Sequence, residues 1–408
     1  MERKLASIQV VKDIRPIVGA DNIEVADVLG WSCVVKKGEF QVGQKAIYFE
    51  IDSILDKTNP TFEFMAQRKF RVRTIKLLKT ISQGLLLPLS CFPELKLEKL
   101  KEGDDVTELT KTTKYDPELT KEQSFMPVKK NRNLMIEFML QFSLFRKIYY
   151  WIKPHVPQSF PSDYVSKTDQ PRLQSEPYKL EKYAQNLCYA TEKLDGCSAT
   201  YVISKNKSKI PFSSKYDYAV CSRNYRVDKN GGTHWAEMSK KYDIELKLID
   251  LFESIKKGTI PSFGVIDIES LESIAIQGEI IGQGIQKNKY KKTEKELRVF
   301  GIIIQTKKNR YRLNQININK ICSIYDLQTV NEVDLFKGCT LPKVDFIGKN
   351  IQDWVDKSIF KTQEKTSDSW AEGIVVSVLE NTTGHIKDSF KVINPQFLLK
   401  YEGEEPEI

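Results

Sequence analysis

Apolar and polar positions alternate over short runs in the first part of the chain, and turn residues separate these runs. Runs of this length, rich in β-branched and aromatic residues and bounded by glycine, are typical of β-strands. The predicted strands are Leu5–Val11, Ile23–Val28, Ser32–Lys36, Lys45–Glu50, Arg71–Leu78 and Leu85–Leu89. Many short strands at this spacing predict a small barrel, and the OB fold is the version of such a barrel that binds nucleic acid.

The pattern of the second half mixes strands with helices. Its strongest helical periodicity runs from His234 to about Ile255, with Thr233 as the expected N-cap. The face expected to be buried comprises Trp235, Met238, Tyr242, Leu246, Ile249 and Phe252. The two halves together predict an α+β fold, with an N-terminal barrel and a C-terminal domain of sheets and helices.

Four segments follow from these patterns: a barrel over 1–110, a connector over 111–177, a second domain over 178–402 and an acidic tail over 403–408. The connector contains a densely apolar stretch, Leu134–Ile152, which we predict to be a helix. Four polar residues interrupt it, so it is too polar for a membrane span. It therefore packs against the domains or docks to a partner or a membrane surface.

Composition adds a weak preference for a polyanionic partner. The 408 residues include 63 Lys and Arg against 54 Asp and Glu, a formal charge of +9. That balance suits nucleic acid but is common among other soluble proteins. Seven scattered cysteines without a Cys-x-x-Cys pair, and an N-terminus without an apolar signal segment, indicate an intracellular protein, cytoplasmic or nuclear. The three histidines lie far apart, so no zinc site or His-based triad is predicted.

The strongest chemical signal is a Lys-x-Asp-Gly run, Thr191-Glu192-Lys193-Leu194-Asp195-Gly196. A lysine amine can attack phosphorus, a carboxylate two residues later can orient it or help to hold a metal ion, and glycine permits a tight turn beside a phosphate. Alone the pattern is weak, since an ordinary charged hairpin turn has the same residues. Its context decides between the two interpretations.

That context is an ordered series of polar and aromatic residues beside strand-like runs. Each member has a structural alternative: an arginine on the surface, an aromatic in the core or a glutamate in a turn. The order as a whole is much less expected by accident than any one member. The series comprises Arg223 in Ser-Arg-Asn, Glu279 in Gly-Glu, Phe300, Glu372 in Glu-Gly and Lys391 in Phe-Lys.

This order resembles the covalent nucleotidyltransferases, which are DNA ligases, RNA ligases and mRNA capping enzymes. The first half is similar to the N-terminal OB domain of the Deinococcus/Naegleria-type RNA ligases. The stretches that carry this similarity begin at Ile17, Gly43 and Ile81, and Lys167-Thr-Asp ahead of Arg172 and Trp235–Ile244 look similar to the same group. The resemblance covers nearly the whole chain and implies a C-terminal nucleotidyltransferase domain of antiparallel sheets and helices.

The resemblance implies an ATP-dependent RNA ligase that works in three steps. Lys193 attacks the α-phosphate of ATP, AMP passes to an RNA 5′-phosphate, and a 3′-OH displaces AMP. The implied substrate is a nick in a duplex with RNA on the 3′-OH side, and we expect a monomer.

The resemblance also implies roles for the remaining residues. The implied catalytic residues are Lys193, Asp195, Glu372 and Lys391. Lys391 neutralises the α-phosphate, Glu279 contacts the ribose and Phe300 stacks on adenine, while Asp195 and Glu372 hold Mg²⁺ or Mn²⁺ through water. The implied nucleotide contacts are Glu192, Gly196, Arg223, Glu279, Phe300 and Lys391.

Two positions depart from the relatives. Gly301 stands where relatives often have aspartate after the stacking aromatic, and Ile393 stands where some carry a second lysine, a role open to Lys387 or Lys400. A basic cluster in the first half either contacts RNA or forms a solvated face, and on a strand Arg71 and Arg73 would share one side. Its predicted RNA-binding members are Arg68, Lys69, Arg71 and Arg73.

Two other functions remain open. One is a ligase that prefers DNA ends or transfers GMP. The other is an OB-fold RNA-binding protein with an inactive transferase domain, which is disfavoured because none of the motif positions is obviously lost.

Overall fold

The computed structural model describes residues 3–95, 97–115, 139, 159–206, 214–265, 267–334 and 350–401. The predicted helix at Leu134–Ile152 and the acidic tail at 403–408 lie outside the described residues, apart from Met139. The chain divides into two compact units, and each is described by itself. The first comprises Met1–Gln9, Lys45–Arg73 and Gly84–Gln158, and the second comprises Val10–Gln44, Thr74–Gln83 and Ser159–Ile408.

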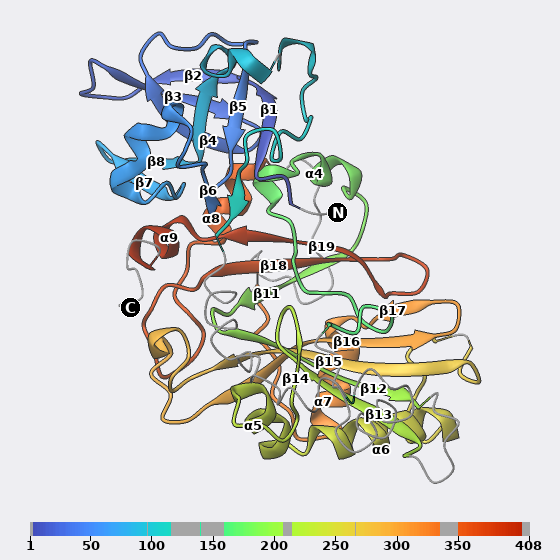
Figure 1. The fold of residues 1–408 in the computed structure, drawn as a ribbon. Helices are drawn as coiled ribbons and strands as arrows, with labels where there is room; N and C mark the ends of the chain where they lie inside the picture. Colours follow the sequence, from blue (N-terminus) through green and yellow to red (C-terminus); the bar gives the residue numbers. More distant parts are fainter. Residues whose placement is uncertain are drawn as a thin grey trace. The chain divides into compact units, whose positions relative to one another are not determined.

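The N-terminal residues form short antiparallel strands, as the alternating pattern predicts (Figure 1). In the first unit, one sheet has the order β1-β5-β9 and a second pairs β10 with β6. In the second unit, β2-β3-β4 form one sheet and β7-β8 another. The strands are β1 (Ala6–Val10), β2 (Asp13–Pro16), β3 (Ile23–Val28), β4 (Trp31–Lys36), β5 (Lys45–Phe49), β6 (Ser53–Ile54), β7 (Thr74–Leu77), β8 (Thr80–Gln83), β9 (Leu85–Pro88) and β10 (Thr113–Lys114).

The predicted strand Arg71–Leu78 is wrong at its start. Lys69 and Phe70 have positive φ angles of 51° and 57°, so the backbone turns there, and Arg71 forms only an isolated bridge with Ile54. The strand begins at Thr74. The short helical turns of this part of the chain are η1 (Pro60–Arg68), η2 (Leu89–Cys91), η3 (Pro93–Leu95) and η4 (Leu97–Lys99).

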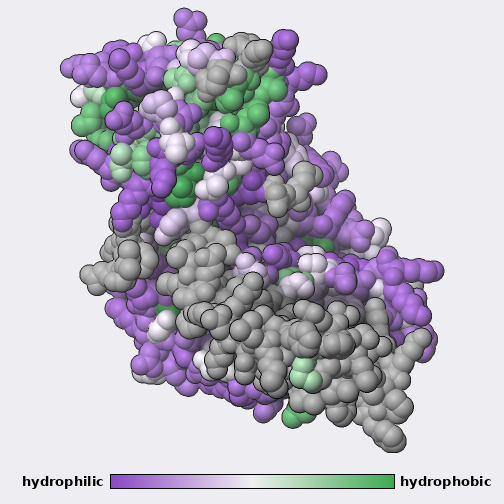
Figure 2. All heavy atoms as spheres, in the orientation of Figure 1, coloured by the Kyte–Doolittle hydropathy of each residue, from purple (hydrophilic) through white to green (hydrophobic). Residues whose placement is uncertain are grey.

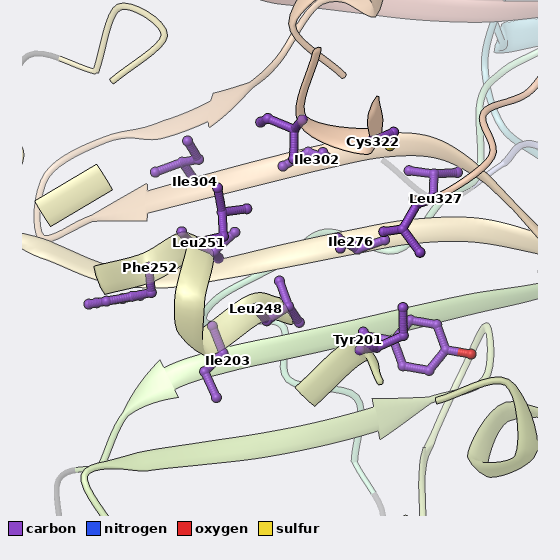
Figure 3. Packing of buried hydrophobic residues seen from close by; sticks show 14 of the residues in the cluster. Tyr201, Ile203, Leu248, Leu251, Phe252, Ile276, Ile302, Ile304, Cys322 and Leu327 are labelled. Carbon is purple, nitrogen blue, oxygen red and sulfur yellow. The ribbon is translucent and has the colours of Figure 1, made fainter. Parts of the chain in front are cut away.

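A six-stranded sheet of order β14-β13-β12-β15-β16-β17 forms the larger part of the C-terminal half. Helices cover one of its faces (Figure 1). Apolar side chains from that face, such as Tyr201, Ile276 and Ile304, pack against Leu248 and Phe252 of the helices (Figure 3). The strands are β12 (Cys197–Lys205), β13 (Tyr216–Cys221), β14 (Arg226–Val227), β15 (Leu271–Ile281), β16 (Glu296–Thr306) and β17 (Arg310–Arg312).

A second, three-stranded antiparallel sheet has the order β11-β18-β19. Its strands are β11 (Cys188–Lys193), β18 (Gly373–Leu379) and β19 (Ile386–Ile393). Alternate residues of the three strands build an apolar core on one face, among them Ala190, Val376 and Phe390. Because side chains alternate along a strand, the opposite face is free to carry polar residues.

The predicted helix from His234 to Ile255 is two helices, α5 (His234–Lys241) and α6 (Ile244–Lys257). Thr233 caps the first as predicted, its hydroxyl accepting from Ala236 N at 3.3 Å. The break is at Asp243, whose φ is 48°, and it changes the phase of the second helix. Leu246 therefore lies 68% exposed instead of buried, and Leu248 and Leu251 face the core. The other helices with described bounds are α4 (Tyr178–Lys182), α7 (Gln315–Ile324), α8 (Ile351–Lys357) and α9 (Pro395–Tyr401), with the short turns η5 (Leu173–Ser175) and η6 (Gln286–Asn288).

The described surface is mainly hydrophilic on the face shown in Figure 2, with smaller apolar areas. Among the described residues, every helix is too short or too polar to cross a bilayer.

Candidate active site

Lys193 is the last residue of β11 and pairs in register with Gly373 of β18. Lys391 of β19 lies opposite Val375 of the same central strand. Because Gly373 and Val375 are two residues apart, Lys193 and Lys391 lie on the same face of the sheet. That face is opposite the apolar core, which explains how two cations are tolerated on short, otherwise buried strands.

Glu372 lies immediately before β18, beside Lys193. The two side chains form an ion pair, with Lys193 Nζ donating to Glu372 Oε2 at 2.5 Å. Glycine is required next to Glu372, because Gly373 has a φ of 146° and a Cβ there would lie 2.1 Å from Val392 O. The Glu-Gly motif thus sets the backbone that places Glu372.

Two further carboxylates surround the Lys193 amine. Burial lowers the pKa of Lys193, but the charges of Glu372, Glu279 and Asp195 outweigh it, so that the pKa is raised. Lys193 is therefore an ammonium ion in this arrangement at neutral pH. A reaction that needs the neutral amine of Lys193 therefore requires added positive charge nearby, which would lower the pKa of Lys193.

The Asp195–Gly196 turn is held by β15 and by the residues that follow it. Gly196 N donates to Glu279 Oε1 at 3.1 Å, and Asp195 N donates to Tyr290 Oη at 2.7 Å. A Cβ at Gly196 would lie 2.3 Å from Ile280 O, so close backbone approach requires this glycine. The Asp195 carboxylate forms an ion pair with Lys289.

Arg223 and Lys391 come together on one carboxylate, that of Asp169. Arg223 Nη2 lies 3.0 Å from Asp169 Oδ1, and Lys391 Nζ lies 3.4 Å from the same oxygen. The segment that contains Asp169 runs along β19, where Lys391 N donates to Pro171 O. The sequence placed Asp169 only in a Lys-Thr-Asp similarity and assigned it no role. The structure therefore joins two predicted phosphate-binding cations through a residue that was missed.

Phe300 lies on β16 at a β-bulge. Gln277 pairs with Gly301 and Gly278 with Val299, so Phe300 is the extra residue of its strand. A bulge redirects a side chain, and the ring packs against a buried cluster that includes Leu194 and Tyr290, beside the Lys-x-Asp-Gly turn. Its half-buried ring is thus next to the residues that flank Lys193.

The Glu192 side chain lies on the opposite face of β11 from Lys193. It is 1% exposed and accepts from Thr362 Oγ1 at 2.5 Å, from Gln363 N at 3.1 Å and from Asn331 Nδ2 at 3.3 Å. Burial raises the pKa of this carboxyl although the three donors oppose the shift. A nucleotide contact by Glu192 is thereby limited to its main chain.

The basic cluster of the first unit splits into two kinds of residue. Arg68 and Lys69 are exposed at the end of η1. Arg71 is 8% exposed; it donates to Asp52 Oδ1 at 2.8 Å, and its guanidinium lies 3.6 Å from the centroid of the Tyr115 ring. The prediction that Arg71 and Arg73 share one strand face for RNA is corrected, because Arg71 is a buried structural residue outside any strand.

Among the described residues, no group of three His, Cys, Asp or Glu side chains is gathered as a metal-binding cluster. The carboxylates whose charges act on the Lys193 amine are those of Glu372, Glu279 and Asp195. Burial raises the pKa of Glu372, Lys193 opposes this shift, and the charge of Asp195 adds to it. Two carboxylates that repel each other, with hard oxygen donors, fit a small divalent cation held partly through water.

Comparison with known families decides which chemistry this arrangement serves. A family model described as RNA ligase matches residues 187–393, more than half of the chain. The chain belongs to the RNA ligase family. A second model, described as an OB-fold domain, matches residues 5–89. The prediction of an α+β RNA ligase with an N-terminal OB-fold domain is confirmed.

Solved structures of the Naegleria gruberi RNA ligase match nearly the whole chain. A mutant with ATP and Mn is 26% identical, with a TM-score of 0.72 over 98% of this chain and 100% of that one. The form with PPi is also 26% identical, with a TM-score of 0.72 over 99% of this chain and 100% of that one. No curated protein matches this ligase.

Proposed function

We propose that this RNA ligase is ATP-dependent and forms a covalent lysyl-AMP intermediate on Lys193. The observation that carries the proposal is the surroundings of Lys193: an ion pair with Glu372 and a second cation, Lys391, on the same sheet face. The similar Naegleria structures contain ATP, AMP and Mn, which supports adenine nucleotide as the substrate.

The first step needs a neutral amine. The Lys193 Nζ lone pair attacks the α-phosphorus, a P–N bond forms, and the bond from the α-phosphorus to the bridging oxygen of pyrophosphate breaks. Three carboxylates keep Lys193 protonated, so positive charge must first offset them. Lys391 stabilises the negative α-phosphate oxygens as the reaction proceeds.

Asp195 and Glu372 are the residues that would hold Mg²⁺ or Mn²⁺, through water. When bound, such an ion supplies the charge that lowers the pKa of Lys193 and neutralises phosphate oxygens. The Asp195 and Glu372 carboxylates would then accept hydrogen bonds from its waters, and Glu372 would release its direct bond to Lys193.

The remaining residues position the nucleotide. Phe300, redirected by the bulge, stacks on adenine, and Glu279 contacts the ribose while still holding Gly196 N. Arg223, paired with Asp169 beside Lys391, binds phosphate through its fork of donors. Gly196 and the main chain of Glu192 complete the contacts beside Lys193.

The nucleic-acid steps follow from the intermediate. The 5′-phosphate of an RNA end attacks the AMP phosphorus and releases Lys193, and a 3′-OH then attacks the capped phosphate and expels AMP. We propose that the substrate is a nick in a duplex with RNA on the 3′-OH side. Arg68 and Lys69, together with Arg73, contact the RNA backbone, and Phe64, 59% exposed on the same helical turn, offers a ring for stacking.

A sealing assay on a panel of nicks tests the substrate. Each nick carries a 5′-phosphate and varies RNA or DNA on either side, with ATP or GTP as the nucleotide. We expect ATP-dependent sealing when RNA lies on the 3′-OH side and at least tenfold less when DNA does. Equal sealing of all-DNA nicks, or labelling of the protein by GTP in preference to ATP, would contradict the proposal.

A further inference from the structure

The dipeptide Lys289–Tyr290 holds Asp195 from two directions. Lys289 forms the ion pair with its carboxylate, and Tyr290, 2% exposed, accepts from its backbone N–H at 2.7 Å. Neither residue belongs to a motif that the sequence singles out. Both lie in a lysine-rich connection between β15 and β16 that resembles an ordinary solvated loop.

The Lys289 ammonium also lies against two aromatic rings of α9. Its Nζ is 4.6 Å from the centroid of the Phe397 ring and 4.6 Å from that of Tyr401. The side chain is 16% exposed, so the cation is largely removed from water. Cation–π contacts are stronger when the ammonium is partly desolvated. Lys289 therefore has a site on α9 that does not depend on Asp195.

The backbone around Lys289 is held in an uncommon conformation. Gln286, Lys287 and Asn288 have φ angles of 43°, 57° and 49°, a left-handed run that non-glycine residues rarely adopt. Ser367 Oγ donates to Lys289 O at 2.7 Å, and the Thr366 hydroxyl donates to Tyr290 O. Strain of this kind persists where the surrounding structure fixes it, and here it delivers a cation to the Asp195 carboxylate.

We propose that Lys289 is a positioning residue that serves as the counter-cation of Asp195 until a divalent ion binds there. The inference rests on the proposed function in assigning Asp195 to metal binding. The ammonium neutralises the carboxylate and fixes the turn after Lys193. It then competes with an incoming divalent cation for the same oxygens and stays on the Phe397 and Tyr401 rings when displaced. Lys289 thus weakens metal binding while no nucleotide is present.

Binding of Mn²⁺ to the nucleotide-free, full-length protein tests this role, with the electron paramagnetic resonance signal of free Mn²⁺ as the readout. We expect Lys289→Met to bind Mn²⁺ about tenfold more tightly than wild type and Lys289→Arg to stay within about twofold of wild type. Lys289→Gln keeps a polar end and should match Lys289→Met, so a folding failure of either one leaves the other. The matched control is Lys291→Met, which removes the same charge from an exposed ion pair with Asp368 and should change nothing.

The double variant Lys289→Met with Asp195→Asn assigns the effect to Asp195, because tight binding should be lost again. Lys289→Met should also lower the Mn²⁺ concentration that gives half-maximal lysyl-AMP formation. Unchanged or weaker Mn²⁺ binding by both neutral variants, or tight binding that survives Asp195→Asn, would overturn the proposal. If wild type formed no lysyl-AMP, the proposed function would fail, but the Mn²⁺ titration would still decide the role of Lys289.

Discussion

At the scale of single residues, Lys391 is the side chain that we propose to stabilise the α-phosphate. Its side chain is 14% exposed and lies on the same sheet face as Lys193, and its ammonium pairs with Asp169 at 3.4 Å. A cation fixed in this way requires little reorganisation when negative charge develops on an α-phosphate. The role that we propose for Lys391 is therefore electrostatic and separable from the nucleophilic role that we propose for Lys193.

We predict that Lys391→Ala lowers the rate of lysyl-AMP formation at least 100-fold, the usual scale for loss of one preorganised group that stabilises a developing charge. Lys391→Arg should recover only part of the activity, since its charge is spread over a fork. The measurement is transfer of label from ATP to the protein. Lys387→Ala, an exposed lysine on the same strand, is the control and should react normally. Normal labelling of Lys391→Ala together with loss of labelling in Lys387→Ala would assign the electrostatic role to Lys387.

The local motifs could be predicted from the sequence because they act through neighbours in the chain. Lys193 and Gly196 stand in a run of four residues, and Glu372 is placed by the glycine that follows it. Asp169 and Lys289 could not be predicted, because their partners are distant in the sequence. Asp169 pairs with Arg223, 54 residues away, and Lys289 pairs with Asp195, 94 residues away. Only tertiary structure brings such pairs together.

At the level of elements, a partly buried ionic cluster joins helix α4 to β19. Lys179 Nζ lies 2.8 Å from Asp388 Oδ2, Tyr183 Oη donates to the same oxygen at 2.7 Å, and Lys179 also pairs with Glu176 at 3.1 Å. The Lys179 side chain is only 5% exposed. Burial raises the pKa of Asp388, but Lys179 and Tyr183 outweigh it and the pKa is lowered.

We predict that Asp388→Asn costs about 2 kcal/mol of stability at pH 7, because it leaves Lys179 with Glu176 alone. A carboxyl whose pKa is lower in the folded state stabilises above its unfolded pKa and loses that contribution as the pH falls through the folded value. The difference between wild type and variant should therefore narrow below about pH 4. Thermal unfolding at a series of pH values measures this difference in stability. A difference that is still present at pH 2 would contradict the contribution assigned to the ionised Asp388.

The predicted elements failed where one residue reversed the backbone. Asp243, with a positive φ, divides one periodic helix into two, and the same conformation at Lys69 and Phe70 shortens the strand that follows. Hydrophobic periodicity is almost insensitive to one such residue.

At the scale of the whole molecule, the residues proposed for nucleotide chemistry and those proposed for RNA contact lie in different compact units. Every residue proposed for the nucleotide lies in the second unit, whereas Arg68 and Lys69 lie in the first. The two functions should therefore be separable by substitution. The buried Arg71 is unsuitable for this purpose, because its replacement would break its pair with Asp52.

We predict that Arg68→Glu with Lys69→Glu leaves lysyl-AMP formation intact and weakens nicked-RNA binding. Loss of two phosphate contacts should reduce the slope of log affinity against log salt by about 1.5–2. The control, Lys57→Glu with Lys101→Glu, makes the same change in charge at exposed positions of the same unit. Binding curves between about 50 and 200 mM salt give this slope for each protein. Equal slopes for wild type and both double variants would place the RNA contact elsewhere.

The central claim is that Lys193 carries AMP, and one measurement tests it directly. Wild type and Lys193→Ala are incubated with labelled ATP and Mn²⁺, resolved under denaturing conditions, and the labelled peptide is identified by mass spectrometry. We predict that AMP is found on Lys193 in the wild type and that the variant takes up no label, although it still seals a nick whose 5′ end already carries AMP. Undiminished labelling of Lys193→Ala, or AMP on a different residue of the wild type, would contradict the account.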